Sequence, residues 1–325
     1  MKRNLALGLS RIGDWGLFAP VLVFLLGIAV PPLALLGQLM LIPCVIVLLT
    51  MSVGIAEPGR IERCEWPPVI LLAACNLVGT PLLIHALMLF FGRSESGGWL
   101  VLVAACPAAG GAALVATLLR LPVRPLLLAQ LLGFFALPLT APLIAWLVLE
   151  GAVVSPTALL LRVVLMVGAP VLLGYALRRY LGERRRLILA RPLRGMGVVA
   201  LCGIALAIAD GLQRVDVTPP IWGDALLGLM VASLLGATLG LLAAASSAGG
   251  LLRGFALGGA VRNVSLLWSA TLGLAPPEGE LVMMLGTLWT LLLPALLGLA
   301  TWQRDRSGRG MRLARSAPIP AGDAD

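Results

Sequence analysis

The chain has 325 residues, of which 60% are hydrophobic and 12% are charged, and its formal net charge is +9. A soluble domain averages about 45–50% apolar and about 25% charged residues, so these charges are too few to cover a soluble surface of this size. The composition excludes a disordered chain, a disulfide scaffold and a secreted globular enzyme, and it predicts an all-α integral membrane protein whose main solvent is lipid.

Ten segments are apolar over the roughly 17–25 residues that a membrane-spanning helix needs. In chain order, they are residues 16–32, 34–53, 67–91, 98–119, 123–149, 156–180, 195–212, 221–246, 251–274 and 280–302. Residues 1–15 lack the pattern of a cleavable signal peptide and are expected to be a cytoplasmic N-terminus. Residues 303–325 are polar and are expected to be a disordered cytoplasmic tail.

The basic residues predict the orientation of these spans. With ten spans, 20 of the 24 lysines and arginines lie on the side of both termini, whereas Arg93 and Arg214 lie on the other. Because cytoplasmic loops carry the excess of positive charge, both termini are expected in the cytoplasm, and a bacterial inner (plasma) membrane is the expected location. The arginines lack interleaved aromatic residues, so the sequence does not favour nucleic-acid binding.

The ten spans, with one long basic connector, Arg178–Arg194, near the middle of the chain, suggest two groups of five spans. Residues 16–149 and 150–302 are therefore predicted to be two five-helix repeats of inverted orientation, as in many secondary transporters. The fourth span of each group contains a glycine pair, Gly110-Gly111 and Gly258-Gly259, and Pro107 precedes the first pair. These residues predict two broken helices, although close helix packing is an alternative role for membrane glycines.

From about residue 15 to 302 the chain resembles the bile acid:sodium symporter family, within the ten-helix superfamily of arsenite and auxin-type carriers. The resemblance is sharpest at Cys106-Pro107, at Arg120, at residues 139–143 (LTAPL) and at Asn263. It implies that broken helices 4 and 9 cross in a six-helix core domain beside a four-helix panel domain formed by spans 1, 2, 6 and 7. It also implies that substrate binds in the crevice between the two domains.

The chain departs from this family at the positions of its sodium ligands. Sodium-using members carry polar side chains where this sequence has Ala112, Ala113, Gly258 and Arg262, and their third-span glutamine corresponds to Asn76. Hard cations need several oxygen ligands, which alanine and glycine side chains do not supply. Weak or absent sodium dependence is therefore expected, with no metal site and no other cofactor.

Arg262 is a charged residue in the middle of an apolar span, where a charge is costly and usually faces a cavity or a partner. It could bind a substrate carboxylate through two parallel hydrogen bonds, bond to carbonyls of its own broken helix, or extend to the membrane surface. Asn263, Ser265 and Asn76 are further substrate-binding candidates, and local backbone carbonyls are their alternative partners. Gly110, Gly111, Gly258 and Gly259 complete the candidate site.

The sequence contains none of the common enzyme motifs, neither HExxH, Walker A, CxxC nor a serine elbow, so no catalytic residue is predicted. The function that these patterns favour is a secondary transporter that moves a small organic anion by alternating access. One alternative is a sodium- or proton-coupled symporter that uses backbone ligands, with the sole histidine, His85, as a proton relay. An alternative from another class is a membrane sensor that binds a ligand without transporting it.

Overall fold

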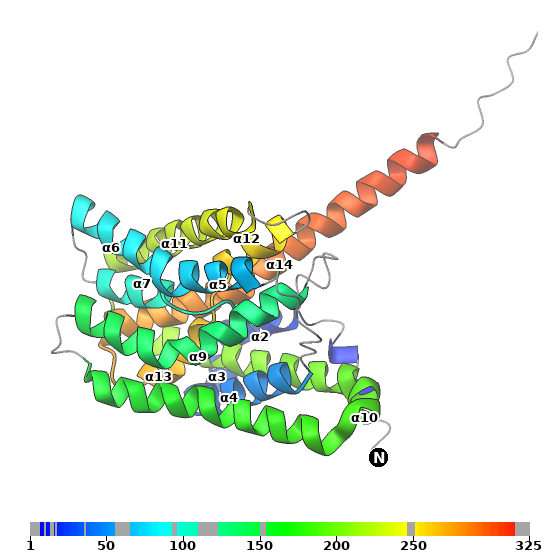
Figure 1. Ribbon diagram of the computed structural model, residues 1–325, viewed down its shortest axis with the longest axis horizontal. Helices are drawn as coiled ribbons and strands as arrows, with labels where there is room; N and C mark the ends of the chain where they lie inside the picture. Colours follow the sequence, from blue (N-terminus) through cyan, green and yellow to red (C-terminus); the bar gives the residue numbers. More distant parts are fainter. Residues whose placement is uncertain are drawn as a thin grey trace, which may run out of the picture.

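The computed structural model describes residues 7–9, 11–13, 16, 18–35, 37–55, 66–92, 96–109, 123–149, 154–245 and 251–315. These residues form helices almost throughout (Figure 1). The helices are α2 (Ala19–Ala29), α3 (Pro31–Ala34), α4 (Gly37–Ile55), α5 (Trp66–Ala74), the π-helix η2 (Cys75–Gly79), α6 (Thr80–Phe91), α7 (Gly97–Ala104), α9 (Val123–Val148), α10 (Pro156–Arg214), α11 (Pro219–Ala245), α12 (Leu251–Ala260), α13 (Val264–Thr271) and α14 (Pro277–Arg315).

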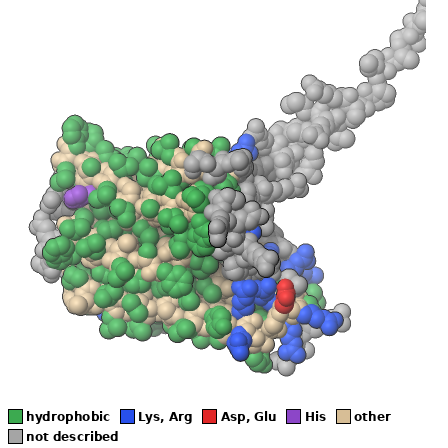
Figure 2. Space-filling view, viewed as in Figure 1, with side chains coloured by type: hydrophobic (Ala, Val, Ile, Leu, Met, Phe, Trp, Pro, Cys, Tyr) green, Lys and Arg blue, Asp and Glu red, His purple; other side chains and the backbone are tan. Residues whose placement is uncertain are grey.

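The prediction of an all-α membrane protein is confirmed. Within the described residues, seven helices are long and apolar enough to cross a bilayer. Large apolar side chains cover the outside, and Leu39, Phe90 and Leu139 are 73%, 82% and 73% exposed. Figure 2 shows this apolar surface, with basic side chains gathered at one end. The chain is an integral membrane protein, because such a surface is stable only against lipid.

The other three predicted spans do not form single long helices in the described part of the chain. Residues 16–32 contain the short helix α2, which ends before Pro31, and residues 251–274 divide into α12 and α13. Residues 98–119 begin with α7, after which residues 110–122 lie outside the described part. Proline follows the ends of α2 and α7, where it removes a backbone donor, whereas the Gly258-Gly259 pair stays helical in α12 and the break comes after Ala260.

The helices pack as two groups. The first, which we call the α10 group, consists of α2, α4 and α10, and α10 packs mainly against the other two. The remaining long helices form the second, which we call the crossover group, and α9, α13 and α14 contact α10 from it. Figure 1 shows α10 turning back on itself, so that both of its arms lie beside α4.

Gly182 forms the bend of α10. Its φ of 64° and ψ of 173° lie in a region that side chains disfavour, so glycine is required there. The basic connector Arg178–Arg194 is helical on both sides of Gly182. Arginine and leucine are good helix formers, which explains why the helices continue through this charged segment.

Residues 303–315, the first part of the segment expected to be a disordered tail, belong to helix α14. Helix α14 continues to Arg315, and Figure 1 shows it extending beyond the other helices. No proline occurs between Pro294 and Pro318, so nothing stops the helix that the preceding span has already nucleated. Residues 316–325 lie outside the described part of the chain.

Glycines bring α11 and α12 into backbone contact. A Cβ atom added to Gly236 would collide with the carbonyl group of Gly259, and one added to Gly259 would collide with that of Gly236. Gly240 approaches the Phe255 carbonyl in the same way. Close helix packing was the alternative role considered for the pair Gly258-Gly259, and it is one role of Gly259.

This contact makes Gly236→Ala a test of the packing between α11 and α12. The new methyl group has only backbone atoms and the Arg262 guanidinium around it, so we expect a loss of about 1–3 kcal/mol and a lower melting temperature in detergent. Gly223→Ala is the matched control, because Gly223 lies on the same helix with nothing within 4 Å of the added atom. Equal melting temperatures for the two variants would contradict the close approach.

Candidate functional site

Two helices of the crossover group are interrupted inside the protein. Helix α7 ends at Ala104, and Pro107, which has no N–H group, follows in a non-helical segment. Helix α12 ends at Ala260 and α13 begins at Val264. We call residues 105–109 and 261–263 together the crossover. The break in the ninth predicted span is thus confirmed, and the fourth span leaves the helical conformation at the predicted proline.

The two non-helical segments pair with each other as a short antiparallel bridge. Ala108 lies opposite Arg262, the Ala109 N–H donates to the Val261 carbonyl at 2.9 Å, and the Asn263 N–H donates to the Pro107 carbonyl at 2.8 Å. Non-helical backbone is tolerated at membrane depth only when such partners satisfy its polar groups. The expectation that the two breaks meet is therefore confirmed.

Gly133 lets α9 pack against this bridge. A Cβ atom at Gly133 would collide with the ring of Pro107, so the absence of a side chain leaves room for the first break. Gly258 similarly lies against Leu126 of α9. The crossover is thus enclosed by α9 on one side and by the glycines of α11 on another.

The Arg262 side chain is the centre of the crossover. It is 6% exposed and donates hydrogen bonds to four backbone carbonyls and one hydroxyl group. Its acceptors are the carbonyls of Gly259 (2.9 Å), Asn76 (2.8 Å), Ala104 (2.7 Å) and Cys106 (3.2 Å), and the Thr80 hydroxyl (2.7 Å). We call this arrangement the carbonyl cage.

The cage carbonyls come from places where helices end or widen. Ala104 and Gly259 lie at the C-terminal ends of α7 and α12, where carbonyls lack intrahelical partners and the helix dipole is negative. The π-helix η2 presents the Asn76 carbonyl, and π-helices are frequent at functional sites. The guanidinium therefore satisfies acceptors that three interrupted elements leave open.

Of the three interpretations of Arg262, extension to the membrane surface is excluded by its burial. Bonding to broken-helix carbonyls is the arrangement present, and most of its five N–H groups are used in this way. Among the described residues, no carboxylate lies within ion-pair distance of Arg262. The positive charge is thus held by dipoles and is not neutralised by an acid.

Asn76 and Gly258 join this cluster, as predicted. The Asn76 amide donates to the Gly258 carbonyl at 3.1 Å, and among the described residues its buried side-chain oxygen has no hydrogen-bond partner. Asn263 and Ser265 lie beyond the bridge, where the Ser265 hydroxyl donates to the Asn263 side-chain oxygen at 3.1 Å. Both side chains are buried, and this contact joins them to each other and not to the backbone carbonyls of their alternative role. Gly110 and Gly111 lie outside the described residues.

Two threonines at this site were not among the predicted residues. The Thr80 hydroxyl accepts from Arg262 and donates to the Cys75 carbonyl at 3.0 Å. The Thr290 hydroxyl of α14 donates to the Arg262 backbone carbonyl at 2.8 Å. A threonine in a membrane helix commonly bonds to its own backbone, so its sequence position alone did not distinguish these two.

Arg162 connects the α10 group to the crossover group. It donates to the Leu272 carbonyl at 2.7 Å and more weakly to the Ala270 carbonyl at 3.5 Å. These carbonyls follow the C-terminal end of α13, where an arginine is favoured by the free acceptors and by the helix dipole.

A buried acid lies near the end of another apolar span. Asp210 of α10 is 4% exposed, pairs with Arg214 at 2.6 Å and accepts a hydrogen bond from the Gln38 N–H at 3.2 Å. It thereby caps the N-terminal end of α4, where the helix dipole favours a negative charge. Because the pair lies within one turn of the end of α10, it is a structural contact away from the cage.

No protein-family profile matches this sequence, and the comparison with curated proteins gives no match either. The geometry of the crossover is therefore the basis for any functional conclusion.

The hydroxyl of Thr80 allows the carbonyl cage to be tested with little change of shape. Thr80→Val removes the acceptor of one guanidinium N–H, and we expect a loss of about 1–3 kcal/mol in thermal unfolding. Thr238→Val is the matched control, since the exposed Thr238 hydroxyl bonds only to the Leu234 carbonyl of its own helix. We expect the control to change stability by less than about 0.5 kcal/mol, and similar losses for both would refute the assigned contact.

Proposed function

We propose that this protein is a secondary transporter that moves a small organic anion by alternating access, without sodium coupling. The observation that carries the proposal is the antiparallel pairing of two interrupted helices around a buried arginine. In secondary transporters, substrate and ion sites lie where discontinuous helices meet near the membrane midplane. The proposal also includes the ten spans in two inverted repeats of the family that the sequence resembles, the bile acid:sodium symporters.

The ligand set of the cage is that of a cation site. Four carbonyl oxygens and a hydroxyl surround one positive charge, and such unwound carbonyls and helix C-termini hold the sodium ion in coupled transporters. In this protein the guanidinium is their partner. A guanidinium attached to the chain satisfies these oxygens as a bound sodium ion would, but it cannot dissociate. This argues against the alternative of a sodium symporter with backbone ligands.

The charge of Arg262 favours an anionic substrate. A guanidinium bonded to carbonyls keeps its full charge, and a carboxylate roughly 6 Å away would gain about 3 kcal/mol at an effective dielectric constant of about 20. The contact therefore acts mainly through the electrostatic field, because most of the N–H donors are used within the cage. Asn76 and Asn263 are both buried and are the candidate amide groups beside this charge, and the Thr80 hydroxyl there already accepts from Arg262.

The packing of the helices supports a division into moving parts. The α10 group contains predicted spans 1, 2, 6 and 7, which form the panel domain in the family that the sequence resembles. Alternating access would move the crossover group against it. The basic side chains at one end of the molecule in Figure 2 support an orientation with this end, and both termini, in the cytoplasm.

Uptake by proteoliposomes tests the absence of sodium coupling. We expect counterflow of a radiolabelled organic anion, chosen by a thermal-shift screen of carboxylates and sulfonates, at rates that agree within about twofold in sodium and in choline buffer. Counterflow separates a carrier from a sensor, since a sensor binds the anion without exchanging it. A steep sodium requirement would overturn the assigned role of Arg262.

Removal of the guanidinium tests the cage directly. Arg262→Ala should abolish counterflow and lower the melting temperature, because it leaves several buried carbonyls without donors. Added guanidinium ion, at millimolar concentration, should restore part of the lost stability by entering the vacated cage. Arg253→Ala, which removes an exposed arginine of α12, is the control and should show neither effect. Unchanged counterflow in Arg262→Ala would rule out the proposed site.

A further inference from the structure

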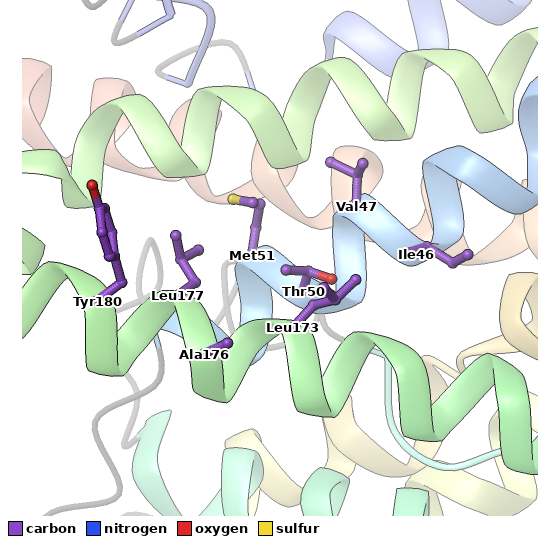
Figure 3. A pocket seen from close by; sticks show the side chains of 8 residues that line it. All are labelled: Ile46, Val47, Thr50, Met51, Leu173, Ala176, Leu177 and Tyr180. Carbon is purple, nitrogen blue, oxygen red and sulfur yellow. The ribbon is translucent and has the colours of Figure 1, made fainter.

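A groove runs along the outside of the α10 group, between α4 and the first arm of α10. Its volume is about 440 Å³. Figure 3 shows the side chains that line it, which are Ile46, Val47, Thr50 and Met51 from α4 and Leu173, Ala176, Leu177 and Tyr180 from α10. Seven of these eight residues are apolar or aromatic, so the groove has the character of the membrane interior.

Close approach of the two helices produces this groove. A Cβ atom at Gly174 would collide with Val53, and one at Gly54 would lie 3.0 Å from the Leu177 side chain. Backbone contact at these glycines draws α4 and α10 together, and the larger side chains before and after them form the walls.

The position of the groove defines its occupant as a lipid chain. Leu173 and Tyr180 are 51% and 80% exposed on the apolar outer surface, which the bilayer covers. A hydrocarbon chain fills such a hollow without loss of hydrogen bonds. An apolar groove alone would accept the acyl chain of any lipid and does not select a headgroup.

Thr50 supplies a polar group inside the apolar groove. It is 8% exposed, and its hydroxyl has no hydrogen-bond partner among the described residues. Thr50 lies five residues before the end of α4 at Ile55, or about 7.5 Å along the helix. An ester carbonyl of a phospholipid lies at a similar depth below its phosphate and would accept the Thr50 hydrogen after rotation of the side chain, because the hydroxyl oxygen itself is buried.

Arginines lie at the end of the groove that Tyr180 marks. Arg179 precedes Tyr180, and Arg184 and Arg185 follow the bend at Gly182; all three are exposed, and the exposed Glu183 is the acid among them. Figure 2 shows basic side chains gathered at the end of the molecule where α10 bends. Arginine binds phosphate through two parallel hydrogen bonds, and basic clusters beside membrane helices select anionic headgroups.

We propose that this groove is a binding site for one anionic phospholipid, with an acyl chain between α4 and α10, an ester at Thr50 and the phosphate at Arg179, Arg184 and Arg185. The site would fix the bend of α10 to the cytoplasmic leaflet. It is separate from the crossover, and it does not depend on the proposed transport function.

Lipid titration of the purified full-length protein, followed by native mass spectrometry, tests the site. We expect one phosphatidylglycerol to bind at least tenfold more tightly than phosphatidylcholine. The triple substitution Arg179→Gln, Arg184→Gln, Arg185→Gln should weaken phosphatidylglycerol binding by about 100-fold, at about fivefold for each charge. The matched control removes the same charge from exposed positions elsewhere, Arg191→Gln, Arg194→Gln and Arg253→Gln, and should change binding less than threefold.

Two further variants test the groove with all arginines retained. Ala176→Trp places a large side chain in the groove and should lower phosphatidylglycerol affinity at least tenfold, and Thr50→Val should lower it severalfold. Melting temperatures in phosphatidylcholine nanodiscs should equal that of the wild type, since Ala176 is exposed. Equal affinity for the two lipids, equal losses in the two triple variants, or full affinity in Ala176→Trp would each overturn the proposal.

Discussion

The hydrogen bonds of the Arg262 guanidinium are the constraint on which the crossover depends. Two helices that stop inside a bilayer leave carbonyls without donors, and each unsatisfied group costs several kcal/mol there. The guanidinium has five N–H donors and forms hydrogen bonds with carbonyls of three interrupted elements, which are α7, α12 and the π-helix η2. The other features of the crossover follow from this, because Gly236 and Gly133 make room for the backbone and Thr80 completes the set of acceptors.

The same arrangement explains how this charge is stable although no carboxylate in the described part of the chain lies within ion-pair distance of it. Carbonyls at helix C-termini carry partial negative charge, so several of them stabilise a cation while the net charge remains. A carboxylate partner would have neutralised Arg262 and removed its long-range attraction for an anion. Asp210 illustrates the contrast, since it lies in the α10 group, pairs with Arg214 and contributes no net charge.

Hydropathy and the cost of buried charge made much of this predictable. The seven long helices follow from apolar length, the interruption after α7 follows from Pro107, and Arg262 was identified because a mid-membrane arginine requires a partner; the second interruption comes after the Gly258-Gly259 pair, which stays helical. Its partners were not predictable, since four of the five are backbone carbonyls and carry no residue signature. The π-helix and the contact of Arg162 with the Leu272 carbonyl were also not predictable, because both arise from tertiary packing.

A cage of this kind also restricts where motion can occur. Breaking the crossover would expose several carbonyls and a guanidinium to an apolar interior, so α7, α12 and η2 must move as one body. The contacts between the two helix groups are different in character, because they are largely apolar side chains together with Arg162 at the end of α13. Sliding along such an interface exchanges one apolar contact for another at little cost. Any alternation between two states is therefore expected at the boundary of the α10 group, with the crossover carried along intact.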